Sequence, residues 1–475
     1  MGKKTNKIRV RFVGENATDV TGSCVLIETE TKKILVECGL FQGENTLLQQ
    51  YRINNGKFRF KVKELNYIIL NHAHIDHVGL VPRLYKEGCT AKIIAPIGLK
   101  RLYETMVRDS AFIMERDAKD LQEKFKRDFE PIYEEKDVLK SLEYWNEFEK
   151  NEVINIDEDI KIRFLNSSHI INSYQSELWV TNSNRTVKIG ITSDLGNIAL
   201  EQYYVNSFQE IEKANLLIGE CTYSNEQRGV TKKDRKKDLE KLETVIEQVC
   251  IDNKGKILIP VFALQRCQVM LSYLYQIFHD RENFDIPIIV DSPLALKVNE
   301  VFLQELEGAE RDFFKEVLQW KNVKFVKEFT DTQSWVEGDK SCVFLSCGGM
   351  LQAGRAVYTA TKLLPNSKNH IIFCGYSTTD SLATKIKNKK TKTINIEGKP
   401  VFCRCGVTVL KSMTSHMQRP ELLNYYSGGN YDKIALVHSN FNDKVNFAKE
   451  LQNEIFKKNK TNKVIVVNKS TEVCL

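Results

Sequence analysis

The stretch Asn71-His72-Ala73-His74-Ile75-Asp76-His77-Val78-Gly79 places three histidines and an aspartate within six residues. It follows the apolar run 67–70, which predicts a buried strand, so the polar cluster begins where a strand ends. Burying that many polar groups together costs free energy unless something pairs them. Neutral imidazole nitrogens and a carboxylate oxygen are ligands that zinc prefers. The stretch therefore predicts a metal centre rather than a group of structural histidines.

Further candidate ligands come directly after other predicted strands. They are His169, Asp194 and His438, which follow the strand-like runs 161–165, 187–192 and 434–437. Ligands at strand ends suit a metal site, because strands hold them in place and the adjoining loops give access. Of the eight histidines, His279 and His370 fall at a predicted helix end and a predicted strand start, where we expect structural roles.

Together these residues are enough for two metal ions. Two zinc ions about 3.5–4 Å apart need about four ligands each, and one carboxylate can bridge them. The two expected ligand sets are His72, His74, His169 and Asp194 for one metal, and Asp76, His77, His438 and the shared Asp194 for the other. A water between the metals would lose a proton near neutral pH and become a nucleophile. The spacing predicts a metallohydrolase but leaves open whether it cleaves an ester, an amide or a phosphodiester.

The composition is that of an ordinary globular protein. The 475 residues are 42% hydrophobic and 28% charged, and the length allows about two to four domains. A net charge of +7 tolerates a nucleic-acid partner without predicting one. No apolar run approaches the roughly 18 residues that span a bilayer, and the N-terminus lacks the apolar segment of a signal peptide. The twelve cysteines form no C-x-x-C pair and many lie in apolar runs, which favours a reducing, cytoplasmic location.

The hydrophobic pattern changes along the chain. Strand-like runs dominate residues 8–110, a helical excursion is expected over residues 98–150, and period-2 alternation returns between 160 and 192. From about residue 207, strands and amphipathic helices alternate, which argues for a separate parallel α/β unit. Strand patterning resumes at residue 393.

These motifs resemble a known family. The H-x-H-x-D-H cluster is similar to the signature of the metallo-β-lactamase superfamily. The other motifs resemble its β-CASP branch of RNA-processing nucleases, in particular the bacterial and archaeal members similar to the cleavage and polyadenylation factor endonuclease. The resembling segments, in the family's order, are Gly39-Leu40-Phe41-Gln42-Gly43, Glu220-Cys221-Thr222-Tyr223, Pro260-Val261-Phe262-Ala263-Leu264, Asp291-Ser292-Pro293-Leu294-Ala295, Gly349-Met350-Leu351 with Gly354-Arg355, Gly375-Tyr376, Thr414-Ser415-His416 and Leu436-Val437-His438.

The resemblance implies an α/β fold, in which a parallel α/β β-CASP domain is inserted into an αββα metallo-β-lactamase sandwich. The sandwich would comprise residues 1–206 and 395–475, and the inserted domain residues 207–394. The active site is then expected in the cleft between the two domains. No membrane partner is expected, whereas a homodimer or a partner protein of a processing complex is compatible with the family.

The resemblance also implies a chemistry. It gives catalytic roles to Asp76, Glu220 and His416, with the glutamate orienting the imidazole so that its cation protonates the leaving oxygen. A histidine at the position of His438 is associated in this family with RNA. The expected function is therefore a zinc-dependent ribonuclease, holding two Zn²⁺ ions and cleaving single-stranded RNA. Candidate substrate contacts, taken from motif-like positions of the inserted domain, are Arg266, Ser292 and Arg355.

This sequence departs from the family pattern near the expected metals. Glu37 replaces an aspartate that hydrogen-bonds around the ligand loop, and its side chain is one methylene longer. Ser168 and Ser193 stand where the family has glycines directly before ligands. Met417-Gln418 replaces the usual Ala-Asp after His416. All expected ligands are present, so a divergent substrate is a better interpretation than lost activity.

Other functions remain open at this point. A non-catalytic RNA-binding scaffold subunit would be expected to lack ligands, and none is missing. A DNA-directed nuclease of the same superfamily would share the metal site. The diiron oxidoreductases with this fold carry an acidic residue at the position of His74 and lack the inserted domain, which argues against that class. The sequence does not distinguish endonuclease from exonuclease.

Overall fold

A computed structural model describes residues 7–43, 46–183, 185–200, 202–224, 230–351, 354–375, 377, 381–388 and 392–475 of the 475-residue chain. These residues form two compact units. The first unit comprises Met1–Ile198, Val205–Gly229 and Ser415–Leu475, and the second comprises Ala199–Tyr204 and Val230–Thr414. The chain of the second unit thus interrupts that of the first.

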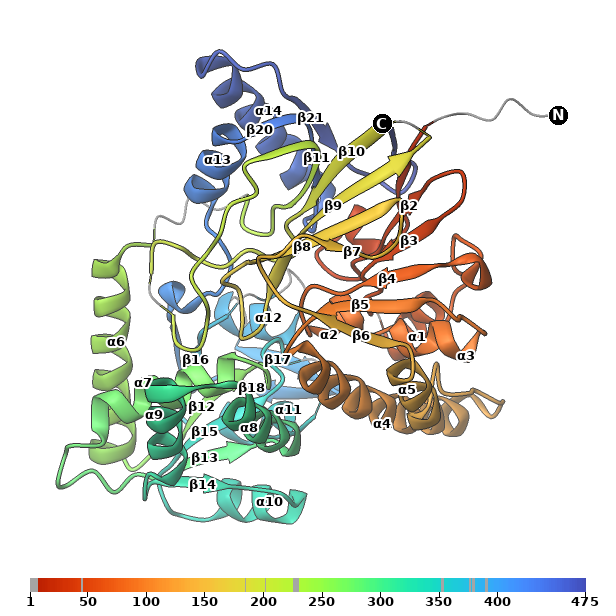
Figure 1. Cartoon of the computed structure of the whole chain (residues 1–475). Helices are drawn as coiled ribbons and strands as arrows, with labels where there is room; N and C mark the ends of the chain where they lie inside the picture. Colours follow the sequence, from red (N-terminus) through yellow and green to blue (C-terminus); the bar gives the residue numbers. More distant parts are fainter. Residues whose placement is uncertain are drawn as a thin grey trace. The chain divides into compact units, whose positions relative to one another are not determined.

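The first unit contains two seven-stranded sheets (Figure 1). One has the strand order β22-β1-β2-β3-β4-β5-β6 and the other β21-β20-β11-β10-β9-β8-β7. The strands are β1 (Arg9–Phe12), β2 (Val25–Glu28), β3 (Lys33–Val36), β4 (Tyr67–Ile69), β5 (Lys92–Pro96), β6 (Trp145–Phe148), β7 (Ile154–Asn155), β8 (Ile160–Asn166), β9 (Tyr174–Asn182), β10 (Arg185–Ile191), β11 (Lys213–Glu220), β20 (Asn430–Val437), β21 (Lys463–Val466) and β22 (Glu472–Cys474).

The core of this unit lies between the two sheets. Alternate residues such as Val10, Ile27 and Ile69 of one sheet share a fully buried cluster with Ile162 and Ile189 of the other. This follows from strand geometry, in which every second side chain points to the same face. The predicted sandwich is therefore present, and helices cover its outer faces.

The helices of the first unit bury the outward side chains of both sheets. On the second sheet, Leu217 and Ile434 pack with Tyr426 of α13 and Phe447 of α14. Helices α1–α5 accompany the first sheet, as Figure 1 shows. The helices are α1 (Leu47–Asn54), α2 (Ile75–Val78), α3 (Val81–Lys86), α4 (Leu99–Phe125), α5 (Glu135–Leu142), α13 (Arg419–Gly428) and α14 (Phe441–Lys457). The layers are helix, sheet, sheet, helix, as expected.

The second unit is built on a six-stranded sheet with the order β14-β13-β15-β12-β16-β19, and every pairing in it is parallel. The chain of this unit also forms a two-stranded antiparallel hairpin, β17-β18. The elements are α6 (Lys232–Ile246), β12 (Ile257–Val261), α7 (Arg266–Phe278), β13 (Ile288–Asp291), α8 (Pro293–Glu305), α9 (Gly308–Gln319), β14 (Val323–Phe325), α10 (Phe329–Glu337), β15 (Val343–Cys347), α11 (Arg355–Leu363), β16 (His370–Phe373), α12 (Leu382–Asn388), β17 (Thr393–Ile396), β18 (Lys399–Phe402) and β19 (Gly406–Val409). All five residues of β12 are buried, as in a parallel sheet covered on both faces.

Three details differ from the sequence-based expectations. Residues 207–224, expected in the inserted domain, belong to the first unit because β11 pairs with β10 and β20, whereas residues 199–204 belong to the second unit. Residues 395–414 belong to the second unit rather than to the sandwich, because β19 pairs in parallel with β16. Within the expected helical excursion, Trp145 lies on edge strand β6, because helix α5 ends at Leu142. Tyr376 of the motif Gly375-Tyr376 lies outside the described residues. Among the residues that the structure describes, no helix is both long and apolar enough to cross a membrane.

Candidate metal centre

The predicted ligands meet at one edge of the sandwich, because each follows the carboxyl end of a strand. His72 follows β4, His169 follows β8, Asp194 follows β10 and His438 follows β20. Strands β10, β11 and β20 pair in parallel, and β8 and β10 both run antiparallel to β9, so their carboxyl ends reach the same edge. Sequence positions almost 370 residues apart are thereby brought together.

One group of possible ligands comprises His72, His74, His169 and Asp194. Their candidate ligand atoms all lie within 4.8 Å of one another. The Asp194 Oδ2 atom is 3.4 Å from His169 Nε2 and 3.6 Å from His72 Nε2. The ring nitrogen His169 Nε2 is 3.3 Å from His74 Nδ1. Three imidazoles and a carboxylate around one point form a ligand set suited to zinc.

A second group comprises Asp76, His77 and His438. The Asp76 Oδ2 atom is 3.5 Å from His438 Nε2 and 3.7 Å from His77 Nε2. Asp194 also reaches this group, since its Oδ1 atom is 3.2 Å from His77 Nε2 and 3.5 Å from His438 Nε2. Asp194 therefore directs one oxygen toward each group, as a bridging ligand would.

Hydrogen bonds on the far side of each ring orient the ligand histidines. His77 Nδ1 donates to Glu37 Oε2 at 2.7 Å, and His438 Nδ1 donates to Thr222 Oγ1 at 2.9 Å. In the neutral tautomers that these bonds select, both Nε2 atoms present lone pairs, and they lie 3.2 Å apart. The buried atoms His72 Nε2 and Asp194 Oδ1 have no hydrogen-bond partner. Facing lone pairs and unpartnered buried polar atoms are stabilised by cations, so the residues present fit divalent metals.

The electrostatics divide the histidines into two kinds. Burial lowers the pKa of His74 to about 4 against the opposing charges of Asp76 and Asp194, and burial also lowers the pKa of His72 and His169. These three rings are neutral at physiological pH, as ligation requires.

His77 and His438 behave in the opposite way. Burial alone would lower the pKa of His77, but Asp194, Glu37 and Asp76 outweigh burial and raise it well above its ordinary value. Burial also opposes the charged form of His438, yet Asp194 and Asp76 raise its pKa. A proton and a metal ion therefore compete for the ring nitrogens of His77 and His438 that face these carboxylates.

The backbone beside the ligands adopts left-handed conformations. Glu37, Ser168, Ser193 and His438 have φ values of 60°, 61°, 50° and 60°. The two serines are those that replace family glycines, so the chain keeps the turn although a side chain makes it less favourable. At position 196 glycine is needed for a different reason, which is lack of space: a Cβ atom there would lie 1.7 Å from Ser168 O.

Glu220 and His416 form the expected pair. Glu220, the last residue of β11, lies with its Oε1 atom 3.2 Å from His416 Nδ1. Its carboxylate is fixed by the backbone amides of Leu195 at 3.1 Å and Thr222 at 2.8 Å. The His416 ring is 4.4 Å from the His169 ring between centroids. The pair thus lies beside the first ligand group, with the imidazole side chain 16% exposed and the carboxylate buried.

Met417 and Gln418, the unusual pair after His416, have structural contacts. Met417 is buried in the cluster beneath α13. Gln418 caps α13 and donates from Nε2 to His416 O at 2.8 Å. The acidic side chain near this turn is that of Glu421, which accepts from Gln418 N at 2.8 Å and from Ile198 N at 3.1 Å.

The candidate substrate residues lie in the second unit and differ from one another. Arg355 donates to Asp291 Oδ1 at 3.1 Å and to Lys327 O at 2.5 Å. Ser292 accepts from Ala295 N at 3.1 Å and so caps α8. Arg266 is buried at the start of α7, and its guanidinium has no partner among the described residues. Both Arg355 and Ser292 therefore have structural bonds, whereas Arg266 does not.

Sequence reasoning missed two residues that orient the ligands. Thr222 bonds to His438 Nδ1, and Ser193 Oγ lies 3.1 Å from His72 Nδ1. Thr222 belongs to the quoted motif Glu220-Cys221-Thr222-Tyr223, and Ser193 was noticed only as a lost glycine. In both cases the available signal was a hydroxyl one or two residues from a predicted site residue.

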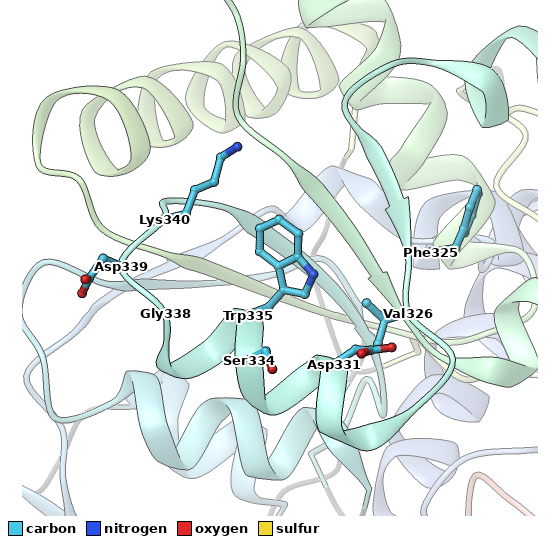
Figure 2. Close-up of a pocket in the computed structure, with 8 residues that line it drawn as sticks. All are labelled: Phe325, Val326, Asp331, Ser334, Trp335, Gly338, Asp339 and Lys340. Carbon is cyan, nitrogen blue, oxygen red and sulfur yellow. The ribbon is translucent and has the colours of Figure 1, made fainter.

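A pocket in the second unit and a small cavity beside the ligands differ greatly in volume. A pocket of ≈ 350 Å³ in the second unit is lined by residues including Phe325, Trp335 and Lys340, with Trp335 at its centre (Figure 2). A cavity of ≈ 20 Å³, lined by Glu37, His77 and Asp194 among others, lies behind the ligands and has room for about one water molecule. The ligand chemistry, rather than cavity size, therefore identifies the candidate site.

Known proteins resemble this chain over most of its length. The family model of the Metallo-beta-lactamase superfamily matches residues 17–137, and that of the Beta-Casp domain matches residues 267–386. The chain is 27% identical to Ribonuclease TTHA0252 of Thermus thermophilus over 89% of this chain and 91% of that protein. It is 24% identical to Transcription termination factor FttA of Methanocaldococcus jannaschii over 95% of this chain and 70% of that protein. A crystal structure of a protein of unknown function from Enterococcus faecalis covers 99% of this chain and 100% of that one, with a TM-score of 0.51 and 12% identity, which indicates a shared fold alone.

Proposed function

We propose that this chain, a member of the metallo-β-lactamase superfamily that carries a Beta-Casp domain, is a zinc-dependent ribonuclease that hydrolyses phosphodiester bonds of single-stranded RNA. The observation that carries the proposal is the pair of ligand groups sharing Asp194 beside the Glu220–His416 pair. The names of the relatives, a ribonuclease and a transcription termination factor, support RNA as the substrate.

The ligand sets would hold two zinc ions. His72, His74 and His169 would bind one ion, Asp76, His77 and His438 the other, and Asp194 would bridge them. Bound zinc supplies Lewis-acid activation of water and of phosphate oxygens. Glu37 and Thr222 keep His77 and His438 in the tautomers that expose Nε2.

The chain's own contribution to bond cleavage would come from His416. Its Nδ1 lies 3.2 Å from Glu220 Oε1, so Nδ1–H is directed to the carboxylate and Nε2 would be the proton-donating nitrogen. The carboxylate is held by two backbone amides, which fixes the direction of the ring. In its protonated form His416 would donate the Nε2 proton to the oxygen that leaves phosphorus. Asp76, partly exposed at the helix α2 turn, lies where it can also accept a hydrogen bond from the attacking water.

The proposal is tested by incubating the zinc-loaded full chain with an unstructured RNA labelled at either end, and with DNA of the same sequence. The RNA should be shortened, and the DNA should survive. Supplying the RNA with a 5′-monophosphate or a 5′-triphosphate and resolving products by length separates a ladder, a single cut and mononucleotides. Zinc-loaded protein that leaves RNA intact while cleaving DNA would make this a DNA-directed nuclease instead.

A further inference from the structure

Three neighbouring strands of the second unit, in the order β15-β12-β16, end at one edge of its parallel sheet. Phe262 directly follows β12, Gly348 and Gly349 follow β15, and Cys374 and Gly375 follow β16. Open parallel sheets bind ligands at the carboxyl ends of their strands. The metal-centre residues all belong to the first unit. The second unit therefore carries its own edge suited to a ligand.

Phe262 presents an aromatic ring at this edge. The residue is 40% exposed although it follows a fully buried strand. Its ring lies against backbone, since a Cβ atom on Gly349 would be 3.1 Å from Phe262 Cε2 and one on Gly375 would be 3.9 Å from it. Single exposed aromatic residues are common on proteins, so the ring is informative only through its neighbour.

That neighbour is Arg266, the first residue of α7. It is 9% exposed, and its guanidinium has no hydrogen bond or ion pair with any described residue. Two other arginines of this unit have partners, since the buried Arg235 donates to Tyr273 and to Ser412 O, and the half-buried Arg355 pairs with Asp291. Arg266 is mostly buried, but none of its nitrogens is among the fully buried atoms that lack a partner, so the guanidinium reaches solvent. A helix N-terminus favours an anion over a cation, so an anion bound there would offset this charge.

Phe262 lies beside the segment that follows β16 and beside the start of α7. Its ring lies near Gly375. The amide of Cys267, in the first turn of α7, donates to Phe262 O at 3.1 Å. Phe262 and the start of α7, where Arg266 is the first residue, are therefore adjacent.

A sharp turn sets this arrangement. Gln265 has φ 72° and ψ −54°, and Arg266 N donates to Leu264 O at 3.0 Å, which together define a γ-turn. Gln265 Nε2 donates to Tyr203 O at 2.9 Å and so holds the turn. Such strained turns persist where the surrounding structure enforces them, commonly at ligand sites.

We propose that Phe262 and Arg266 form a nucleotide subsite, in which a base of a single strand stacks on the Phe262 ring and the adjacent phosphate binds the Arg266 guanidinium at the start of α7. This rests on the proposed function, because it takes the strand to be RNA. Exposed aromatic rings next to cationic groups bind single strands without sequence preference, since every base has a π-face. The phosphate would supply the counter-charge that Arg266 lacks in the chain itself.

The test is RNA affinity measured by fluorescence anisotropy, using the full chain with chelator so that RNA is not consumed and an unstructured RNA of about 12 nucleotides. Phe262→Leu keeps an apolar side chain but removes the ring, and it should weaken binding roughly 5- to 150-fold. Arg266→Met should weaken binding and lower the slope of log affinity against log salt by about 0.7, the contribution of one phosphate contact on a single strand. Phe262→Leu should leave that slope unchanged.

Two matched controls come from the same unit. Phe325 is 39% exposed, so Phe325→Leu removes a ring of equal exposure, one that lines the pocket of Figure 2. Arg404, over the Phe402 ring at 5.4 Å, is exposed, so Arg404→Met removes one positive charge elsewhere. Both should bind RNA as the unaltered chain does. If the control variants lose as much affinity as the Phe262 and Arg266 variants, the subsite does not exist.

A strand of abasic sugar-phosphates separates stacking from a change in fold. Phe262→Leu should have no effect on its binding, whereas Arg266→Met should still weaken it. An equal loss for Phe262→Leu on normal and abasic strands would show that the ring acts on the fold and would overturn the proposal. Arg266→Met should also unfold at the same or a higher temperature, because it removes a mostly buried charge that has no partner among the described residues. A large decrease would reveal a structural role and count against the subsite.

The two proposals fail in different ways. If zinc-loaded protein hydrolyses no RNA but binds it with the expected dependence on Phe262 and Arg266, the catalytic proposal fails and the subsite stands. If the protein hydrolyses RNA while both variants bind like the unaltered chain, the subsite fails and the catalytic proposal stands.

Discussion

Ser193 Oγ donates to Glu37 Oε1 at 2.5 Å, and these are two of the residues that depart from the family pattern. The same hydroxyl lies 3.1 Å from His72 Nδ1, whose N–H it accepts. The other Glu37 oxygen accepts from His77 Nδ1. One carboxylate therefore orients a histidine in each ligand group, His77 directly and His72 through Ser193. The longer side chain of Glu37 and the added hydroxyl of Ser193 are hydrogen-bonded to each other, so these two departures from the family pattern are structurally linked.

We expect Glu37→Asp and Ser193→Gly each to lower zinc affinity by roughly 10- to 100-fold, the usual effect of losing a residue that orients a metal ligand. The shorter aspartate cannot reach both partners, and glycine leaves Glu37 Oε1 with only the longer hydrogen bond from Asn71 Nδ2 at 3.4 Å. The double variant restores the family pair, so its loss should be smaller than the two single losses combined. Competition titration with a chromophoric chelator measures this coupling.

Ser168→Gly is the matched control for Ser193→Gly. Ser168 has φ 61° against 50° for Ser193, so both substitutions relieve a left-handed serine. The Ser168 side chain has no recorded bond to a ligand, so its replacement should leave zinc affinity unchanged. Strictly additive losses for Glu37→Asp and Ser193→Gly, or an equal loss for Ser168→Gly, would show that the hydroxyl does not transmit the orientation.

His416→Ala and Asp194→Ala should separate catalysis from metal binding. His416 belongs to neither ligand group, so its loss should reduce RNA turnover roughly 100-fold or more while the zinc content stays near that of the unaltered chain. Asp194→Ala removes the shared carboxylate and should reduce both turnover and zinc content. Elemental analysis of the purified proteins, alongside turnover, measures the difference.

His279→Ala is a suitable control for the loss of a histidine, because His279 stacks on Tyr275 in the second unit. It should alter neither zinc content nor turnover. If His416→Ala releases zinc as Asp194→Ala does, the imidazole supports the metal site rather than the leaving oxygen.

The sequence predicted the parts of the site that depend on local pattern. His72, His169 and Asp194 follow strands that were recognisable by their apolar residues, and strand ends bring side chains to one edge. The two family matches confirm the resemblance that the motifs indicated. Contacts made by common residues were harder to predict, because any serine or threonine near the site could have oriented a ring. Ser193 and Thr222 are distinguished only by tertiary distance.

Some pairings within the second unit could not be predicted from the sequence either. The residues of β19 alternate as any strand does, and nothing in them specifies that they pair with β16 rather than with the sandwich. Arg355 was a candidate phosphate ligand, but its guanidinium bonds to buried Asp291, which lies 64 positions earlier. Pairing partners distant in sequence decide such cases, and the residue pattern of a single strand or turn does not specify them.

Removal of zinc should destabilise the protein. Without metal, Asp76 and Asp194 remain clustered with His72, His74 and His169, which burial keeps from charging. A metal that binds the folded chain alone adds about 2.7 kcal/mol of stability at a free concentration of about 100 times Kd. Thermal unfolding with and without a chelator should therefore show a lower midpoint for the metal-free chain. The shift should be much smaller in Asp194→Ala, and an equal shift in that variant would indicate a metal bound elsewhere.

Lys444 on α14 gives a prediction of how stability depends on pH. It is fully buried and donates to two backbone carbonyls, those of Ala17 and Val467, the latter at 2.9 Å. Burial lowers its pKa from the ordinary 10.5 to about 8. The folded chain therefore releases this proton before the unfolded chain does, and stability rises with pH between about 8 and 10.5.

Lys444→Met should remove that rise. The difference between about 8 and 10.5 corresponds to roughly 3 kcal/mol, so the unaltered chain should gain about that much relative to the variant across this interval. The variant also leaves two buried carbonyls without a donor, which lowers its stability at every pH and does not affect the slope. Burial raises the pKa values of buried cysteines and tyrosines such as Cys221 and Tyr103, which also makes stability depend on pH, but these groups are common to both proteins and cancel in the comparison. Urea unfolding of both at several pH values measures the effect, and parallel curves would show that Lys444 keeps its ordinary pKa in the folded chain.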